Sequence, residues 1–345
     1  MLRVPGWPTA LAAAYAAAGH AGGVAMLLSP PPASAGLPAA LLRLAGAVAL
    51  LCHARVVAAV LVHDATHDAV FARGWRNAAA GTALLWLAGT PYCYFPHVQK
   101  VHVAHHRDRA DTVEFDYRAF VSRFRGLRAA VLAAEWAFIP ATELLMHART
   151  ALSPLAWPDS PWHRLSSCAG LIAVAAQHWQ LFTQGGLLAV AAYFLSTCGL
   201  IHVLSYHDCF AHTYTVVDPT QRGYRPGPAD RTAAYEEANT YSTVVSASMP
   251  WLNVLTLQFG YHNAHHRSTG TPWYRLPALH RKLYGARLDA CPQVLSWRQL
   301  RHTWVKNRLR RVLEEDYGCV YPGAGLSPQR VKDFVGSLGV SFLTV

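Results

Sequence analysis

The chain has 345 residues, of which 52% are hydrophobic and only 14% are charged. Its length would allow two soluble domains, but this composition and a positive mean hydropathy indicate one membrane-embedded unit. The formal net charge of +11 fits the Lys- and Arg-rich cytoplasmic loops of membrane proteins better than nucleic-acid binding. Seven cysteines without a CxxC pair indicate neither a disulfide framework nor a zinc–thiolate site.

Apolar runs define the expected membrane segments. The first, Pro8 to Leu28, follows a basic start that a signal peptide would also show. A transmembrane helix is expected here, because the run is long and other apolar runs follow. The lengths of these other runs approach the roughly 20 residues that a bilayer requires. The runs cover Pro38 to Ala54, Cys168 to Phe182 and Gly185 to Ser205. The sequence therefore predicts about four transmembrane helices in two hairpins, 8–62 and 168–205.

The charge distribution predicts the orientation of these helices. The turns at 29–38 and 180–186 carry no charge, whereas the stretches 100–128 and 275–311 are basic. We expect the turns outside, and the basic stretches with both chain ends in the cytoplasm. The run from Asn77 to Phe95 is expected to dip into or lie along the interface. The predicted fold is an all-α integral membrane protein with interfacial helices and a cytoplasmic helical cap.

Three short motifs contain eight of the chain's 19 histidines: HDATH at 63–67, HVAHH at 102–106 and HNAHH at 262–266. On a helix, residues three and four apart share a face. The candidate ligands are therefore His63, His67, His102, His105, His106, His262, His265 and His266. Each motif alone could be a polar helix end among lipid headgroups. Two identical HxxHH spacings beside a third motif favour a shared site in the cytoplasmic cap.

Eight imidazoles with few carboxylates suit a borderline transition metal better than calcium or magnesium, which prefer oxygen ligands. One zinc ion takes about four ligands, so eight histidines imply two metal ions. A nitrogen-rich site for two metals at a membrane favours iron acting on dioxygen. The sequence thus predicts two iron ions, with O2 as a co-substrate.

These motifs resemble the membrane fatty acid desaturase superfamily of di-iron enzymes, which includes alkane hydroxylases and carotenoid ketolases. The resemblance runs from about Arg55 to Tyr284 and rests on the three motifs, on DTVEFD after the second, on NTYS at 239–242 and on PWYRLPALH at 272–280. The motifs are specific for the superfamily and weak for the substrate. We expect one such domain over 1–345, with a tail after about residue 322.

In that family a further histidine ligand follows, by four residues, an Asn or Asp that holds a metal-bound water. DCFAH at 208–212 offers His212 as the ninth ligand, with Asp208 in the water-mediated or outer role, one helical turn earlier. His207 and His202 compete for the ligand role on the same helix. If His207 were the ligand, Asp208 could not share its helix face.

Other polar residues near the motifs receive less specific interpretations. Carboxylates could orient the ligating imidazoles through their second nitrogen, and those close to the motifs are Asp64, Asp68, Asp108, Asp111, Glu114, Asp116, Asp208, Glu236 and Glu237. Histidines without ligand spacing are expected to be structural or interfacial, namely His20, His53, His97, His147, His163, His178 and His302. His280 is expected to pack within the cap.

The resemblance implies oxidation of an unactivated C–H bond in an acyl chain, most simply desaturation of a fatty acid on a lipid, coenzyme A or an acyl carrier protein. Hydroxylation or ketolation at the same site is the alternative, and a metal transporter is a more distant one. A separate ferredoxin or similar donor with its reductase is implied, because the chain shows no Gly-rich flavin or nicotinamide motif. Arg107, Arg109 and Arg275 could receive an anionic headgroup. The composition suggests a bacterial plasma membrane.

Overall fold

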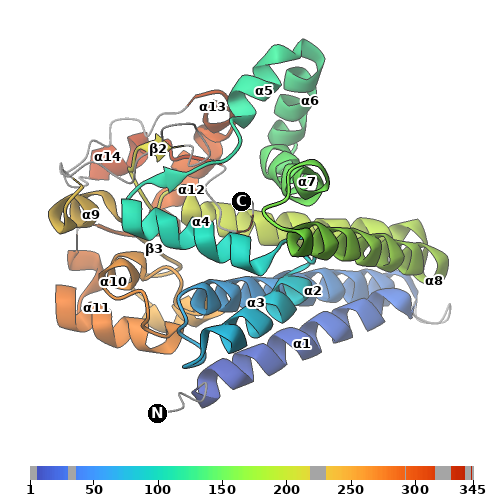
Figure 1. Cartoon of the computed structure of the whole chain (residues 1–345), viewed down its shortest axis with the longest axis horizontal. Helices are drawn as coiled ribbons and strands as arrows, with labels where there is room; N and C mark the ends of the chain where they lie inside the picture. The colour runs from blue at the N-terminus through green and yellow to red at the C-terminus, as the bar shows by residue number, and fades with distance from the viewer. Residues whose placement is uncertain are drawn as a thin grey trace. The chain divides into compact units, whose positions relative to one another are not determined.

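The computed structural model describes residues 6–29, 36–217, 231–291, 293–314, 328–338 and 343. The chain is largely helical (Figure 1), and it divides into two compact units. Unit 1 comprises 1–97 and 150–203, and unit 2 comprises 98–149 and 204–345. The helical fold class is confirmed, whereas the single domain over 1–345 stays a prediction.

Unit 1 contains the long apolar helices. They are α1 (Trp7–Leu28), α2 (Gly36–Thr66) and most of α8 (Pro161–Asp208). These three helices are long and apolar enough to cross a membrane. Their shared core includes Leu27 of α1, Leu51 of α2 and Tyr193 of α8. The predicted turn at 29–38 falls partly on residues 30–35, which lie outside the described residues.

Small residues allow α1 and α2 to approach closely. A Cβ atom at Gly23 would lie 2.5 Å from Leu51 Cγ, and one at Gly19 would lie 2.8 Å from Ala54 Cβ. The two glycines are four residues apart and therefore occupy one face of α1. Small residues at this spacing are typical of helix pairs that pack in lipid.

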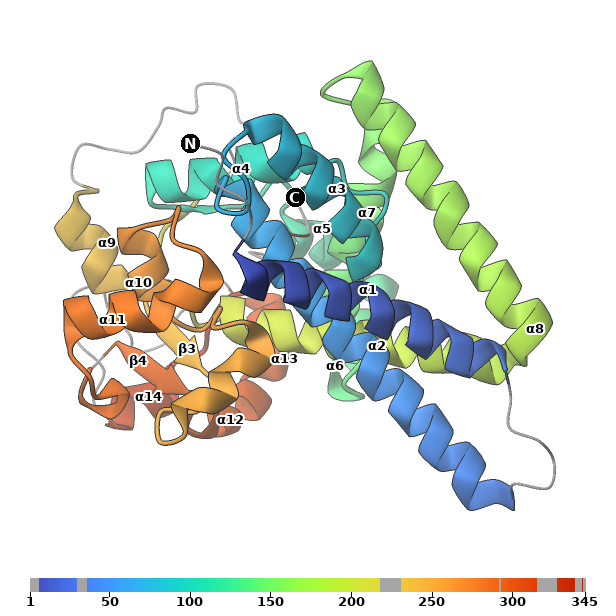
Figure 2. The ribbon, with the colours of Figure 1, turned by 90° about the horizontal axis from the view of Figure 1, so that it is seen from below.

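Helix α8 is broken at Gly186, whose backbone leaves the helical region with φ 72° and ψ −174°. A positive φ is readily adopted by glycine. Figure 2 shows α8 as two arms that meet at an angle. The break lies at the end of the predicted turn at 180–186, so each arm corresponds to one predicted helix. How many segments cross a bilayer stays a prediction.

Helix α3 (Gly74–Ala88) begins three residues before the apolar run from Asn77 to Phe95. Gly89, which has φ 85°, caps its C-terminus. Its 15 residues are fewer than the roughly 20 that a bilayer requires. This length agrees with the prediction that the run from Asn77 to Phe95 does not span the membrane.

Arg55 is a buried cation within α2, with 1% of its surface exposed. Its Nη1 donates hydrogen bonds to Ser196 Oγ at 3.0 Å and Thr197 Oγ1 at 2.9 Å. Its guanidinium carbon lies 4.0 Å from the centre of the Tyr193 ring. Burial of a charge is costly unless polar groups satisfy it, and these three α8 residues make the burial tolerable.

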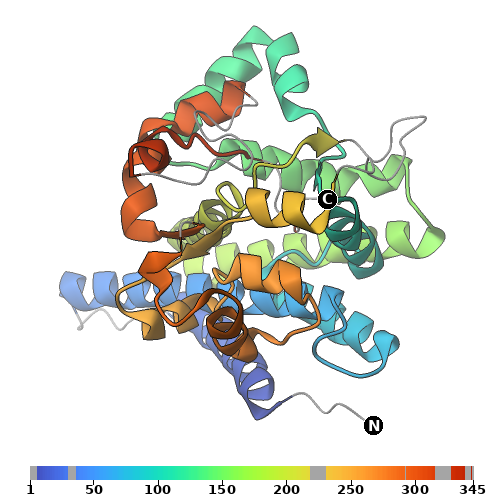
Figure 3. The same ribbon diagram turned by 90° about the vertical axis from the view of Figure 1, so that its left-hand side faces the viewer.

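In its described residues, unit 2 contains the end of α8, short helices (Figures 1 and 3) and four very short strands. Its N-terminal part contains α4 (Phe95–Asp108) from Val98 onward, β1 (Asp111–Thr112), α5 (Tyr117–Arg123), α6 (Arg125–Trp136) and the start of α7 (Ala141–Ala156). Its C-terminal part contains β2 (Val216–Val217), α9 (Ala233–Asn239), β3 (Ser242–Val244), α10 (His262–Arg267), α11 (Leu276–Tyr284), β4 (Val294–Ser296), α12 (Trp297–Lys306), α13 (Arg308–Leu313) and α14 (Pro328–Asp333), with 3-10 turns at Pro250–Thr256, Trp273–Arg275 and Leu288–Ala290.

The four short strands were not predicted, and they leave the chain mostly helical. They form two parallel pairs: β1 with β2, where Asp111 faces Val216, and β3 with β4, where Ser242 faces Val294. With two or three residues each, they are too short to show an alternating pattern. Residues 218–230 and 315–327 lie outside the described residues, and so does the start of the predicted tail after about residue 322.

Candidate metal centre

The second histidine motif lies on α4, where helical spacing brings its side chains together. Nε2 of His102 lies 3.2 Å from Nε2 of His106. His105 turns its other nitrogen, Nδ1, to Ala110 O at 2.7 Å. Because a carbonyl oxygen only accepts, Nδ1 of His105 carries the proton and its Nε2 keeps a free electron pair.

The third motif forms α10, a helix of six residues whose three histidines are buried. Nε2 of His262 and Nε2 of His266 lie 3.1 Å apart, one helical turn from each other. Just before the helix, a Cβ atom at Gly260 would lie 2.5 Å from the backbone oxygen of Thr243. Glycine therefore lets the start of α10 lie directly against β3.

The NTYS motif explains how α10 and His212 are held in place. Ser242 Oγ donates to Asn263 Oδ1 and accepts from the Asn263 backbone N–H at 3.2 Å, which fixes α10 to β3. Asn239 Oδ1 accepts from Thr213 Oγ1 at 2.7 Å. Thr240 pairs with His212 through an isolated β-bridge. The motif therefore acts on both segments that carry ligand candidates.

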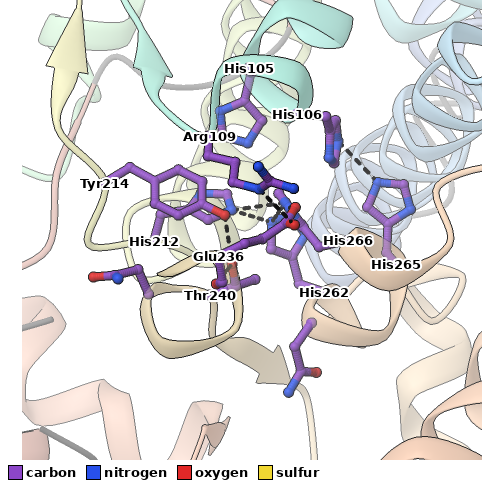
Figure 4. Close-up of polar contacts among 12 residues, drawn as sticks. His105, His106, Arg109, His212, Tyr214, Glu236, Thr240, His262, His265 and His266 are labelled. Atoms are coloured by element: carbon purple, nitrogen blue, oxygen red, sulfur yellow. Dashed lines mark hydrogen bonds and ion pairs between the residues drawn. The ribbon is translucent and has the colours of Figure 1, made fainter. Parts of the chain in front are cut away.

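His212 lies beyond the end of α8, in a short segment that follows a turn. Its Nε2 lies 2.9 Å from Nε2 of His262 and 2.9 Å from Nε2 of His266 (Figure 4). Its ring stacks on Tyr214, with centroids 4.4 Å apart. The expectation that Asp208 and His212 share one helix is wrong, because α8 ends at Asp208.

The competing histidines occupy other environments. Nδ1 of His207 lies 2.9 Å from Thr243 Oγ1, and its ring packs against Phe259 and Trp297. It belongs to no group of potential metal ligands found among the described residues. His202 lies on the part of α8 that belongs to unit 1.

The ligand candidates of unit 2 form two groups. In the first, His105, His212 and His266 each offer a ligand atom, and these atoms lie within 4.8 Å of one another; His262 adjoins this group through His212 and His266. In the second, the ligand atoms of His102, His106 and His265 satisfy the same limit, with 3.2 Å between Nε2 of His106 and Nε2 of His265.

The first motif belongs to unit 1, at the end of α2. Helix α2 ends at Thr66, so His63 lies in its last turn and His67 directly follows it. The ring centroids of the two histidines are 5.0 Å apart. The spacing of four therefore places the two rings side by side, as predicted.

Carboxylates contact the outer nitrogens of several ligand candidates. Nδ1 of His266 lies 3.0 Å from Glu236 Oε1. Buried Asp111 places Oδ1 3.5 Å from Nδ1 of His212 and 3.6 Å from Nδ1 of His105. Such partners fix the ring tautomer and orientation of metal ligands. Asp111 and Glu236 therefore fit the predicted orienting role.

Three other carboxylates that lie close to the histidine motifs in the sequence make different contacts. Asp116 accepts from the Ala119 N–H at the start of α5. Glu114 pairs with Arg149 at 3.4 Å, and Asp108 pairs with the neighbouring Arg107. None of these contacts is to a ligand candidate.

Arg109 contacts the site in a way that the sequence did not predict. Its Nε donates to Glu236 Oε2 at 3.0 Å, so Arg109, Glu236 and His266 form a continuous chain (Figure 4). Arg109 also donates to the backbone oxygen of Arg231 at 2.5 Å. The sequence indicates only that a basic residue follows the second motif, and the partner is 127 residues away.

Burial keeps the imidazoles of His105, His212 and His266 neutral. It lowers the pKa of His105 to about 4. Burial, reinforced by neighbouring histidines, lowers the pKa values of His212 and His266 well below the usual 6.5. Neutral imidazole is the form that binds a metal, so these rings are ready to act as ligands at neutral pH.

Replacing Glu236 tests the importance of this orienting chain. Glu236→Gln removes the charge that Arg109 pairs with and weakens the acceptor for His266. We expect metal affinity to fall about 10- to 100-fold, as is usual for such partners. The measurement is competition for metal against a chromophoric chelator. Exposed Glu237 supplies the matched control, Glu237→Gln, and equal affinities in the two variants would contradict the role of Glu236.

Comparison with known proteins agrees with this geometry. The family model described as "Fatty acid desaturase" matches residues 38–298. The sphingolipid delta(4)-desaturase of Candida albicans (strain SC5314) is 29% identical over 149 residues, which are 40% of this chain and 38% of that protein. The chain thus covers less than two thirds of the length of that relative. The chain belongs to the fatty acid desaturase family.

Proposed function

We propose that the protein is a di-iron desaturase that removes two hydrogen atoms from an acyl chain. Nine histidines would hold the irons. His105, His212, His262 and His266 form one group in unit 2, and His102, His106 and His265 form the other. His63 and His67 are proposed as the remaining ligands because their spacing of four places the two rings 5.0 Å apart at the end of α2.

The convergence of imidazole nitrogens carries this proposal. Five pairs of Nε2 atoms lie between 2.9 and 3.2 Å apart. The outer nitrogens of His105 and His266 face protein oxygens, which leaves their Nε2 atoms unprotonated. Nitrogens this close together are placed to bind a shared cation as ligands.

Iron rather than zinc is proposed because the reaction needs a redox-active ion. Imidazole ligands suit both metals, but zinc has no redox chemistry.

The overall reaction balances with one dioxygen and two external electrons. The acyl chain loses two C–H bonds and gains a C=C bond. The two hydrogen atoms that it loses combine with dioxygen, two electrons and two protons to form two waters. Bound iron would supply the reactivity with dioxygen. Glu236 and Asp111 would keep the ligand rings oriented. Asp208 is proposed to hold a metal-bound water or to act from outside the ligand shell.

The proposed substrate is an acyl chain of a membrane lipid. The C. albicans relative is named for desaturation of a sphingolipid, and the apolar helices of unit 1 suit a lipid environment. The proposed partners are a ferredoxin-like donor with its reductase, and an acyl carrier protein is a further candidate. We propose a multi-pass protein of a bacterial plasma membrane, with the site and both ends cytoplasmic.

A comparison of lipids tests the function. Cells with the native electron-transfer partners would express the wild-type chain, His265→Ala or His302→Ala, and their hydrolysed lipids would be compared by mass spectrometry. We expect a product lighter by two hydrogens with the wild type and with His302→Ala, because His302 is exposed on α12. His265→Ala should lose it. A gain of one oxygen would indicate a hydroxylase, and unchanged product in His265→Ala would contradict the proposal.

A further inference from the structure

A second cluster of metal-ligating side chains lies within unit 1. It consists of His97 in the first turn of α4, Asp159 just before α8 and His163 in the first turn of α8. One ligand atom from each of the three lies within 4.8 Å of the others. None of the three belongs to a histidine motif, and both histidines were expected to be merely structural.

The contacts within the cluster centre on Asp159. Its Oδ2 lies 2.5 Å from Nδ1 of His97. Its backbone N–H donates to Nδ1 of His163 at 3.3 Å. Because Nδ1 of His163 accepts a hydrogen bond, it is the unprotonated nitrogen of that ring. An ion pair needs only His97 and Asp159, whereas His163 adds a third potential ligand atom within 4.8 Å of theirs.

The histidine rings are held firmly by their surroundings. The ring of His163 stacks on Tyr94 with centroids 5.1 Å apart, and its centroid is also 5.1 Å from that of His97. The His163 backbone N–H donates to Ser160 Oγ at 3.1 Å. Side chains fixed in this way lose little freedom when they bind an ion.

The two chain segments that carry the cluster are packed closely. A Cβ atom at Gly170 of α8 would lie 2.3 Å from the carbonyl carbon of Pro91. Ser167 Oγ donates to the backbone oxygen of Tyr92 at 3.0 Å. The segment before α4 and the start of α8 therefore have a fixed separation, which a small ion could bridge.

The cluster is accessible from one side. His97 and His163 are 9% and 6% exposed, whereas the side chain of Asp159 is 40% exposed. Asp159 borders a surface cleft of about 500 Å³, whose other lining residues are Pro158, Ser160, Pro161, Arg164, Leu165 and Cys168. An ion bound to Asp159 would thus have room for a water or another small ligand.

We propose that His97, Asp159 and His163 bind one divalent transition-metal ion, with a coordination position open to this cleft. Two imidazoles, one carboxylate and one exchangeable ligand are a donor set that zinc accepts. The ion takes the place of the proton shared by His97 and Asp159, so that proton passes to solvent. Binding therefore strengthens as pH rises, and the bound ion links the start of α8 to residues 91–97.

Zinc binding to the purified full-length chain tests the site. The protein in detergent, with its histidine motifs loaded with iron, would be equilibrated with zinc, and both metals would be counted by mass spectrometry. We expect the wild type to hold one zinc more than Asp159→Asn, and zinc affinity to fall at least about tenfold in that variant. Asp159 is part-exposed, so this variant should fold. Exposed Asp289 supplies the control, Asp289→Asn, which should match the wild type.

Two results would overturn the proposal. One is a wild type that binds no more zinc than Asp159→Asn, which would leave a simple His97–Asp159 ion pair. The other is a His163→Ala variant, shown to be folded, that keeps wild-type zinc affinity. His265→Ala should retain this zinc while it loses metal at the motifs, so a failure here is distinguishable from a failure of the di-iron proposal.

Discussion

His212→Ala is expected to lose iron and to lower desaturation by about three orders of magnitude or more. Its Nε2 lies 2.9 Å from the same atoms of His262 and His266, so its removal opens the group that would hold one ion. Loss of an outer partner of a metal ligand already costs about 10- to 100-fold, and loss of a ligand should cost more. The measurements are iron per chain and product formed per iron.

His207→Ala is the matched control for this substitution. Both residues are buried histidines, with 6% exposure for His212 and 1% for His207. His207 contacts Thr243, Phe259 and Trp297, so its loss should lower stability and leave the iron content unchanged. The reverse pattern, with iron lost in His207→Ala and kept in His212→Ala, would show that the ninth ligand has been misassigned.

Arg308→Met is expected to destabilise unit 2 by about 3–5 kcal/mol, the usual cost of breaking a buried ion pair. Arg308 Nη2 lies 2.6 Å from Glu135 Oε2, and the two side chains are 7% and 3% exposed. The pair joins α13 to α6. Its loss leaves the Glu135 carboxylate buried without its cation, although the Thr142 N–H still donates to Oε1 at 2.9 Å. The measurement is the midpoint of thermal unfolding in detergent.

Two further variants separate charge burial from other effects. Arg310 and Glu314 form an exposed pair at 2.6 Å, so Arg310→Met should cost less than about 1 kcal/mol. The double variant Glu135→Leu/Arg308→Met removes both buried charges and should recover much of the lost stability. If Arg308→Met unfolds at the same temperature as Arg310→Met, the buried pair does not stabilise unit 2.

Local periodicity made the histidine motifs predictable. His102 and His106 converge because they are one helical turn apart on α4, and His262 and His266 do so on α10. These contacts require only that the segment be helical. The same rule failed for Asp208 and His212, because α8 ends between them.

Long-range contacts could not be predicted from the sequence. Glu236 and Glu237 look equivalent in the chain, but only Glu236 faces His266, because the orientation of α9 decides it. Thr240 pairs with His212 across 28 residues through a single β-bridge. Such short strands carry no periodic signal.

The membrane helices were predicted better than their ends. Length and apolar composition located α1 and α2, while the break in α8 depends on the backbone of a single residue, Gly186. The close approach of α1 to α2 follows from Gly19 and Gly23. Their spacing was present in the sequence, but several other glycines in apolar runs have no such contact.

The iron content of the purified wild-type chain tests most directly whether the histidines form a two-metal centre. After anaerobic reconstitution and removal of loosely bound metal, the proposed ligand set predicts two irons per chain, with Mössbauer spectra of nitrogen-rich iron sites. Fewer than two irons in active protein, or full activity in protein without iron, would contradict it.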